Sequence, residues 1–244
     1  MRTSADVAPA NARVDDILAW LQRRGTQRNR EGMARYGIRS ARAFGVSMAT
    51  MRPLVTRLGR DHDLAIALWE TGWLEARVLA SFVDDPAQVT RAQMERWCRA
   101  FDNWAVCDSV CLHLFDKTPH AFDKVTQWSR RTREFERRAA FALLASLAVH
   151  DRRAPDDAFT SRVVLIESAA TDERNFVKKA VNWALRQVGK RNAALNAAAV
   201  TLARRLAASG SRPARWVGKD ALRELTSATT LARIEARAAR RARP

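Results

Sequence analysis

Apolar residues recur at three- and four-residue steps along nearly the whole chain, which is the pattern of amphipathic α-helices. Breaks in this pattern fall at segments with proline or glycine, at 84–86, 118–119, 154–155 and 210–213. The stretch after residue 24 is less regular and carries Gly32, Gly37 and Gly45. Helices are predicted near residues 13–24, 47–59, 61–70, 73–83, 90–101, 103–116, 119–130, 133–149, 157–169, 173–190, 192–208, 213–226 and 229–242.

The composition agrees with an all-α fold. The chain has nine Gly and seven Pro among 244 residues, alanine is abundant, and runs of β-branched residues are scarce. With 47% hydrophobic residues, a chain of this length buries a sizeable core as one or two domains. We expect one domain over residues 1–228, followed by a basic Arg/Ala-rich tail over residues 229–244 that is either a DNA-contacting end or a solvated helix.

A weak internal repeat refines the expected architecture. Similar blocks of charged and apolar residues surround Arg77, Arg138 and Lys179, and Asp108 falls near the middle of the longer interval. Repeats of about 30–45 residues are typical of a right-handed HEAT-like or armadillo-type solenoid, in which the second helix of each pair lines a concave face. These four residues are therefore predicted to share one groove, and an ordinary helical bundle is the alternative.

The charge of the chain is high and unevenly distributed. The formal net charge is +17, with 17 Lys and Arg against 14 Asp and Glu in residues 1–122 and 26 against 12 in the remainder. Such an excess favours a phosphate backbone as the partner, with binding that weakens steeply as salt rises. A membrane surface is the rival partner, but the sequence has no apolar run long enough to span a bilayer, no signal segment and no lipidation motif.

The segment 174–192 joins an apolar helix face to a cationic one. The indole of Trp183 lies among three cations at helical spacing, which suits a polyanion that also presents a ring or a sugar for stacking. A core tryptophan beside solvated cations is the alternative. The cations that we expect to contact DNA here are Lys178, Lys179, Arg186, Lys190 and Arg191.

Trp104 and Asp108 are candidates for chemistry because they stand four residues apart on one helix face. A carboxylate beside an indole in a cationic groove suits the departure of a base from deoxyribose, since the sugar then develops oxocarbenium character. The alternative is a helix-capping or ion-paired Asp108, with Arg138 or His113 as partner, and Trp104 in the core.

Other chemistries find little support. The sequence has no phosphate-binding glycine loop, no dinucleotide fingerprint and no hydrolase or zinc-protease motif. The cysteines Cys98, Cys107 and Cys111 fit a reducing cytoplasm, and with His113 they do not complete a tetrahedral metal site. No metal is expected.

With these residues in view, the chain resembles the AlkD-like DNA alkylation repair glycosylases, a family built of HEAT-like repeats. The resemblance covers roughly residues 30–225. Tyr36 resembles the aromatic residue of the family's N-terminal region that lies against DNA. The motifs that carry the resemblance are Trp104-x3-Asp108, Phe135-Glu-Arg-Arg138-Ala-Ala and Lys179-Ala-Val-Asn-Trp183-Ala-Leu-Arg186.

The resemblance implies hydrolytic excision of positively charged N3- and N7-alkylated purines, such as 3-methyladenine and 7-methylguanine, from double-stranded DNA. Asp108 would be the catalytic carboxylate, Trp104 and Trp183 would pack against the deoxyribose and backbone, and Arg138 would hold a phosphate nearby. It further implies a cytoplasmic monomer without a metal, nucleotide or redox cofactor. A non-catalytic HEAT-repeat protein that binds bent or branched DNA is the main alternative, and a helical-repeat protein adaptor is a weaker one.

Overall fold

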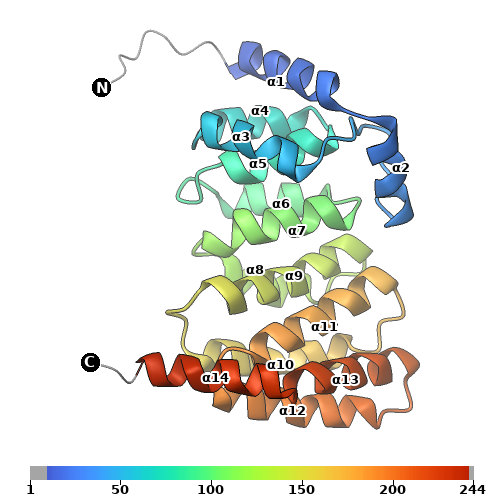
Figure 1. Ribbon diagram of the computed structural model, residues 1–244, viewed down its shortest axis with the longest axis vertical. Helices are drawn as coiled ribbons and strands as arrows, with labels where there is room; N and C mark the ends of the chain where they lie inside the picture. The colour runs from blue at the N-terminus through green and yellow to red at the C-terminus, as the bar shows by residue number, and fades with distance from the viewer. Residues whose placement is uncertain (1–9, 242–244) are drawn as a thin grey trace.

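The computed structural model describes residues 10–241, and within them it contains fourteen α-helices, one short 310 helix and no strand. The helices form a stack that runs from α1 at one end to α14 at the other (Figure 1). Their bounds are α1 Ala10–Arg24, α2 Gln27–Arg35, α3 Met48–Leu58, α4 His62–Glu70, α5 Leu74–Val83, α6 Arg91–Arg99, α7 Trp104–His113, the 310 helix Phe115–Lys117, α8 Ala121–Trp128, α9 Glu134–His150, α10 Asp156–Ala169, α11 Asn175–Gly189, α12 Ala193–Ala207, α13 Arg212–Leu225 and α14 Ala228–Arg241.

Consecutive helices pair, and the second members of the pairs form a continuous row. Helix α4 packs on α5, α8 on α9, α10 on α11 and α12 on α13, while α5, α7, α9, α11 and α13 pack against one another in that order. This row carries Arg77 on α5, Asp108 on α7, Arg138 on α9 and Lys179 on α11. The helical pairing predicted from the sequence is therefore present, and it brings the predicted residues onto successive helices of one layer.

Helix α2 was not predicted, and it occupies the first part of the irregular stretch expected after residue 24, while residues 36–47 are irregular as expected. None of its residues is buried, so it lacks the apolar periodicity that marks the other helices. Polar contacts hold it in place. The Thr26 hydroxyl caps its N-terminus by accepting from the Asn29 amide at 3.2 Å, and the Asn29 side chain donates to the Gly45 carbonyl at 2.8 Å.

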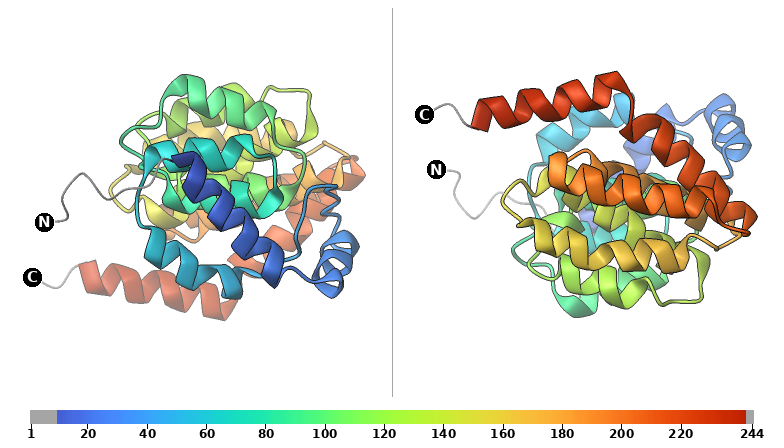
Figure 2. Two further views of the ribbon diagram at one scale, coloured as in Figure 1. Left: turned by 90° about the horizontal axis from the view of Figure 1, so that it is seen from above. Right: turned by 90° about the horizontal axis from the view of Figure 1, so that it is seen from below.

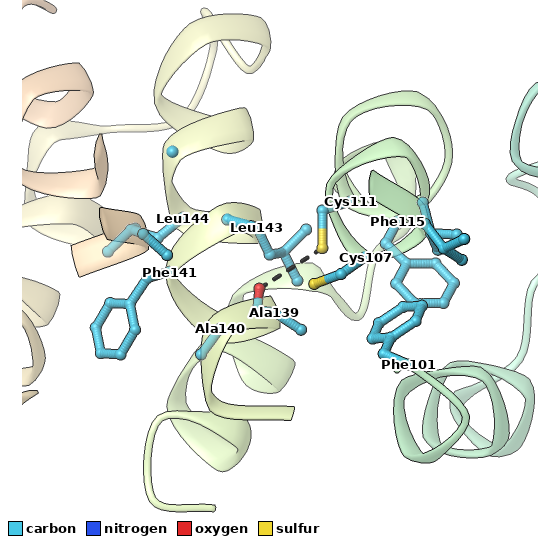
Figure 3. Close-up of a cluster of buried hydrophobic side chains, with 14 of the residues drawn as sticks. Phe101, Cys107, Cys111, Phe115, Ala139, Ala140, Phe141, Leu143 and Leu144 are labelled. Carbon is cyan, nitrogen blue, oxygen red and sulfur yellow. Dashed lines mark hydrogen bonds between the residues drawn. The ribbon is translucent and has the colours of Figure 1, made fainter. Parts of the chain in front are cut away.

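The core is densest where α7 packs on α9. Residues 139–148 of α9 are all buried, and Cys107 and Cys111 of α7 face that helix among aromatic and aliphatic side chains (Figure 3). Their Sγ atoms lie 3.8 Å from the Phe135 carbonyl oxygen and 3.6 Å from that of Ala139. Burial raises the pKa of the Cys111 thiol, which keeps it neutral. These cysteines pack the helix interface, and no metal-ligand cluster occurs within residues 10–241.

A buried carboxylate fixes the loop between α2 and α3. Glu75, in the first turn of α5, accepts backbone N–H bonds from Phe44 at 3.0 Å, Gly45 at 2.7 Å and Val46 at 3.1 Å. Gly45 adopts φ +81°, and a Cβ there would lie 2.4 Å from the Thr26 carbonyl oxygen. This loop and α2 are thereby held in one position beside the helix row.

Replacing Glu75 with alanine should destabilise the protein without touching the candidate site. Three buried donors would lose a charged acceptor, which corresponds to about 2–3 kcal/mol and a fall in melting temperature of about 4–12 °C. The matched control is the exposed Glu70→Ala, expected to stay within about 0.5 kcal/mol of the parent. Equal melting temperatures for Glu75→Ala and the parent, measured by calorimetry, would show that this carboxylate is dispensable.

The residues predicted as a basic tail are helical as far as Arg241. Helix α14 packs on the body through the side chains of Thr230 and Ile234, which are both buried. Residues 1–9 and 242–244, which the predicted domain and tail include, lie outside the described part of the chain. Within that part, no helix combines the length and apolar character needed to cross a lipid bilayer.

Candidate active site and nucleic-acid interface

A cavity of about 350 Å³ lies where the end of α2 meets α7, α9 and α11. We call it the Asp108 cavity. Six of its seven lining residues were predicted from the sequence to act in catalysis or DNA binding, and the seventh, Phe176, was not. The lining residues are Tyr36, Trp104, Asp108, Arg138, Phe176, Lys179 and Trp183.

Asp108 and Arg138 form a two-point ion pair at the wall of this cavity. Arg138 Nε donates to Asp108 Oδ1 at 2.9 Å, and Nη2 donates to Oδ2 at 2.7 Å. The third bond runs from Arg138 Nη1 to the Phe176 carbonyl oxygen at 2.6 Å. The Arg138 side chain is only 8% exposed, and three of its N–H groups are engaged in these bonds. The phosphate contact that the resemblance implied for Arg138 stays a prediction.

Of the two partners considered for Asp108 from the sequence, Arg138 and His113, the structure shows Arg138. His113 instead stacks on Phe82, with ring centroids 4.0 Å apart. Burial, with the nearby Lys117 and His150, lowers the pKa of His113 to about 4, so this side chain is neutral at pH 7. The neighbouring Arg137 points elsewhere and pairs with Asp172 at 3.0 Å. Of the two adjacent arginines, Arg138 is therefore the one that lines the cavity.

The electrostatic state of Asp108 is set by two opposing effects. Burial raises the pKa of its carboxyl, and the charge and hydrogen bonds of Arg138 oppose that rise. Two parallel N–H···O bonds from a guanidinium are the geometry of an ionised carboxylate. Asp108 keeps 16% of its side chain exposed at the cavity wall, so a bound group can reach it.

Aromatic rings form the remaining walls. Trp104 Nε1 donates to the Tyr36 carbonyl oxygen at 2.9 Å, which ties the start of α7 to the end of α2. The Tyr36 side chain itself is 75% exposed. Trp183 of α11 is half-buried, so neither indole is a fully buried core residue. The cavity is thus lined by the flat apolar faces of aromatic rings together with a carboxylate.

Phe176 lines the cavity through contacts that the sequence did not reveal. Its ring lies 5.5 Å from that of Phe135 and approaches Gly37 so closely that a Cβ there would lie 2.7 Å from the ring. Gly37 also adopts φ +78°, a conformation that favours glycine. In the sequence Phe176 is simply an apolar position of a helix, and nothing distinguishes it from a core residue.

The cations predicted on α11 have different surroundings. Lys179 is exposed and lines the Asp108 cavity. Lys178 lies with its Nζ 5.0 Å from the ring centroid of Trp216, which is 40% exposed. Both side chains are on the surface, where a phosphate backbone can contact them.

Further along α11, the charges of Arg186 and Lys190 are balanced by a carboxylate of α13. Glu224 accepts from Arg186 Nη1 at 2.5 Å and from Lys190 Nζ at 2.6 Å. The stripe of three equal cations expected from helical spacing is therefore only partly realised, because Glu224 is distant in sequence and adjacent in the fold.

Arg191 and Arg77 have structural partners. Arg191 donates to the carbonyl oxygens of Ala148, Asp151 and Ala154 at 2.9–3.1 Å, and so closes the end of α9 and the following loop. The Arg77 guanidinium lies 5.0 Å from the ring centroid of Trp69 and does not line the Asp108 cavity. Neither side chain is placed as the free phosphate ligand that the sequence suggested.

The comparisons with known proteins agree with this architecture. The model of the DNA alkylation repair enzyme family matches residues 17–225. A solved structure described as belonging to a new family of proteins related to the HEAT-like repeat DNA glycosylases, with affinity for branched DNA structures, superposes with a TM-score of 0.70. It is 20% identical in sequence, and the match covers 78% of this chain and 82% of the other. No curated protein matches the chain.

Proposed function

This chain belongs to the DNA alkylation repair enzyme family, and we propose that it is a DNA glycosylase that releases cationic N3- and N7-alkylated purines from duplex DNA. The observation that carries the proposal is Asp108, held by two hydrogen bonds from Arg138 at the wall of an open cavity that two indoles also line.

The chemistry follows from the charge of the lesion. An N3- or N7-alkylated purine is already cationic, so it leaves with the electron pair of the glycosidic bond and becomes neutral without being protonated. The deoxyribose is left with oxocarbenium character, and a fixed carboxylate nearby stabilises that charge. Water then adds to the anomeric carbon and loses a proton. Trp104 and Trp183 would pack against the sugar during these steps.

Arg138 acts in this mechanism as a positioning residue. Its two bonds fix both oxygens of Asp108, and its charge favours the ionised form of the carboxyl despite burial. It does not need to contact DNA. The third bond, to the Phe176 carbonyl, anchors the guanidinium to α11 and so fixes the spacing between α7, α9 and α11.

We further propose that the duplex lies along a concave, basic face of a right-handed solenoid, with Lys179 and Tyr36 beside the lesion. Both side chains are exposed next to the Asp108 cavity. We also propose that the protein acts in the cytoplasm as a monomer. It would need no cofactor, because the reaction requires only a carboxylate and water.

A second candidate function is structure-selective DNA binding without chemistry. It is favoured by the relative of similar fold, whose description names affinity for branched DNA structures. It is also compatible with an Asp108 that serves only to balance Arg138. This function would use the same surface but would not depend on the charge of Asp108.

The proposal is tested by incubating the protein with duplex DNA treated with a methylating agent and separating the released bases by chromatography. We expect 3-methyladenine or 7-methylguanine, and no unmodified purine, above the spontaneous background. Release no faster than in protein-free controls, together with tight binding to a four-way junction, would favour the second function.

A further inference from the structure

A second cavity, of about 470 Å³, lies between α14, the end of α9 and the C-terminal end of α11. We call it the arginine cleft. No acidic residue is among the described residues that line it. Its basic lining residues are Arg152, Lys190, Arg191, Arg233, Arg237 and Arg240.

One wall of the cleft is a row of arginines on α14. Arg233, Arg237 and Arg240 stand at i, i+4 and i+7, so they project from one face of the helix. Neighbouring like charges on a helix repel one another unless a negative partner lies between them. Such a row is expected where an anion binds.

The row is held in place against the body. Ile234, next to Arg233 in sequence, is only 6% exposed and packs on the body, and the Thr230 amide donates to the Ser227 hydroxyl at 3.3 Å at the start of the helix. Arg237 Nη1 donates to the Lys190 carbonyl oxygen at 2.9 Å. The arginines of α14 therefore face the end of α11 at a defined position.

The cleft continues the surface of the Asp108 cavity. Lys179 and Trp183 line that cavity, and Gln187 and Lys190 line the cleft, all from one side of α11. From Trp183 to Lys190 the helix rises by about 10 Å. Figure 2 shows α14 on the same side of the stack as α3, at the opposite end. A ligand that reaches Asp108 and extends along α11 would meet the cleft next.

We propose that the arginine cleft binds the phosphodiester backbone of the DNA flanking the nucleotide at Asp108. This inference rests on the proposed function, in which the ligand is duplex DNA. The cleft would contact the duplex on one side of the lesion only. A phosphate fits because three arginines of α14 line the cleft together with Arg152, and because guanidinium groups bind phosphate oxygens in pairs. One duplex would then contact both Asp108 and the cleft. The contacts at the cleft would increase affinity and take no part in the chemical step.

The test uses the full chain and a triple variant, Arg233→Gln/Arg237→Gln/Arg240→Gln. The control removes the same charge from exposed arginines of the outer helices α6 and α12, as Arg96→Gln/Arg99→Gln/Arg204→Gln. Binding to an unmodified duplex is measured against salt concentration. We expect the log–log slope to fall by about 2 to 3 in the cleft variant, since each lost phosphate contact contributes about 0.9. The control should keep nearly the slope of the parent.

Duplex length gives a second readout. Starting from a short duplex centred on the lesion, extension of one flank should tighten binding by the parent, and extension of the other should not. The cleft variant should gain nothing from either extension. Equal slopes for parent and cleft variant, equal losses in the cleft and control variants, or gains from both flanks would each overturn the proposal.

Two further measurements keep the result interpretable. If the triple variant melts below the parent, Arg233→Gln/Arg240→Gln replaces it, because that change leaves the bond from Arg237 to α11 intact. Binding is also measured with Asp108→Asn, which should show the salt slope of the parent. If the parent released no alkylated base while the slopes of the parent and the cleft variant still differed, the proposed chemistry alone would be wrong. If the parent excised the base but the two slopes were equal, the cleft proposal alone would be wrong.

Discussion

Asp108→Asn should release 7-methylguanine from duplex DNA about a hundred- to a thousandfold more slowly than the parent, as expected when one preorganised electrostatic group is removed. The substitution keeps the size of the side chain and one oxygen that accepts from Arg138, while it removes the negative charge. Arg138 also keeps its bond to the Phe176 carbonyl. Binding to duplex DNA should therefore persist, and single-turnover release is the measurement that isolates the chemical step.

Asp102→Asn is the matched control for that variant. Asp102 is exposed in the loop just before α7, so the same chemical change there should leave release unaffected. Release by Asp108→Asn at the rate of the parent would mean that the carboxylate has no part in the reaction.

Arg138→Met should shift the acidic limb of the pH profile of excision to higher pH. Burial raises the pKa of Asp108, and Arg138 now opposes that rise, so without Arg138 the pKa should move further up. Since the ionised form is the active one, activity is lost as pH falls through this pKa. The acidic limb of the pH profile, measured between about pH 5 and 9, should therefore shift to higher pH in the variant. Removing one partner of a buried pair should also cost about 3–5 kcal/mol of stability.

Two variants separate the effect on Asp108 from loss of the fold. Arg137→Met removes the adjacent guanidinium, which pairs with Asp172, and should leave the acidic limb unchanged. Arg138→Lys keeps a positive charge beside Asp108 and should restore most of the acidic limb, although one ammonium cannot reproduce the two-point contact. A profile for Arg138→Met that only falls in height, without moving along the pH axis, would contradict the positioning role.

Helix periodicity was sufficient to predict most of the architecture, because most helices of the stack bury an apolar face. Helix α2 was missed for the same reason, since nothing in it is buried and capping and tertiary hydrogen bonds hold it. The Glu75 contacts with residues 44–46 also join segments distant in sequence. Such contacts leave no periodic signal.

The sequence singled out most of the residues that line the Asp108 cavity, but it did not specify the contacts among them. Trp104, Asp108 and Trp183 line one cavity, as motif spacing suggested. The partner of Asp108 stayed open between Arg138 and His113, because spacing along a helix does not specify which neighbouring helix faces it.

Charge patterning overestimated the number of free cations on α11. Arg186 and Lys190 look unpaired in the sequence, but α13 brings Glu224 beside both. Conversely, the sequence left the arginines of α14 open between a DNA-contacting end and a solvated helix, and the fold turns them toward α11 as one wall of a cavity. In both cases the deciding fact is helix packing between segments more than 30 residues apart.

The most direct measurement of the central claim compares two duplexes that differ only in the lesion, one with cationic 7-methylguanine and one with neutral hypoxanthine. In the proposed mechanism Asp108 stabilises a sugar cation and the leaving base is not protonated, so the protein should release 7-methylguanine and leave hypoxanthine in place under single-turnover conditions. Release of hypoxanthine at a comparable rate, or of neither base, would contradict the account.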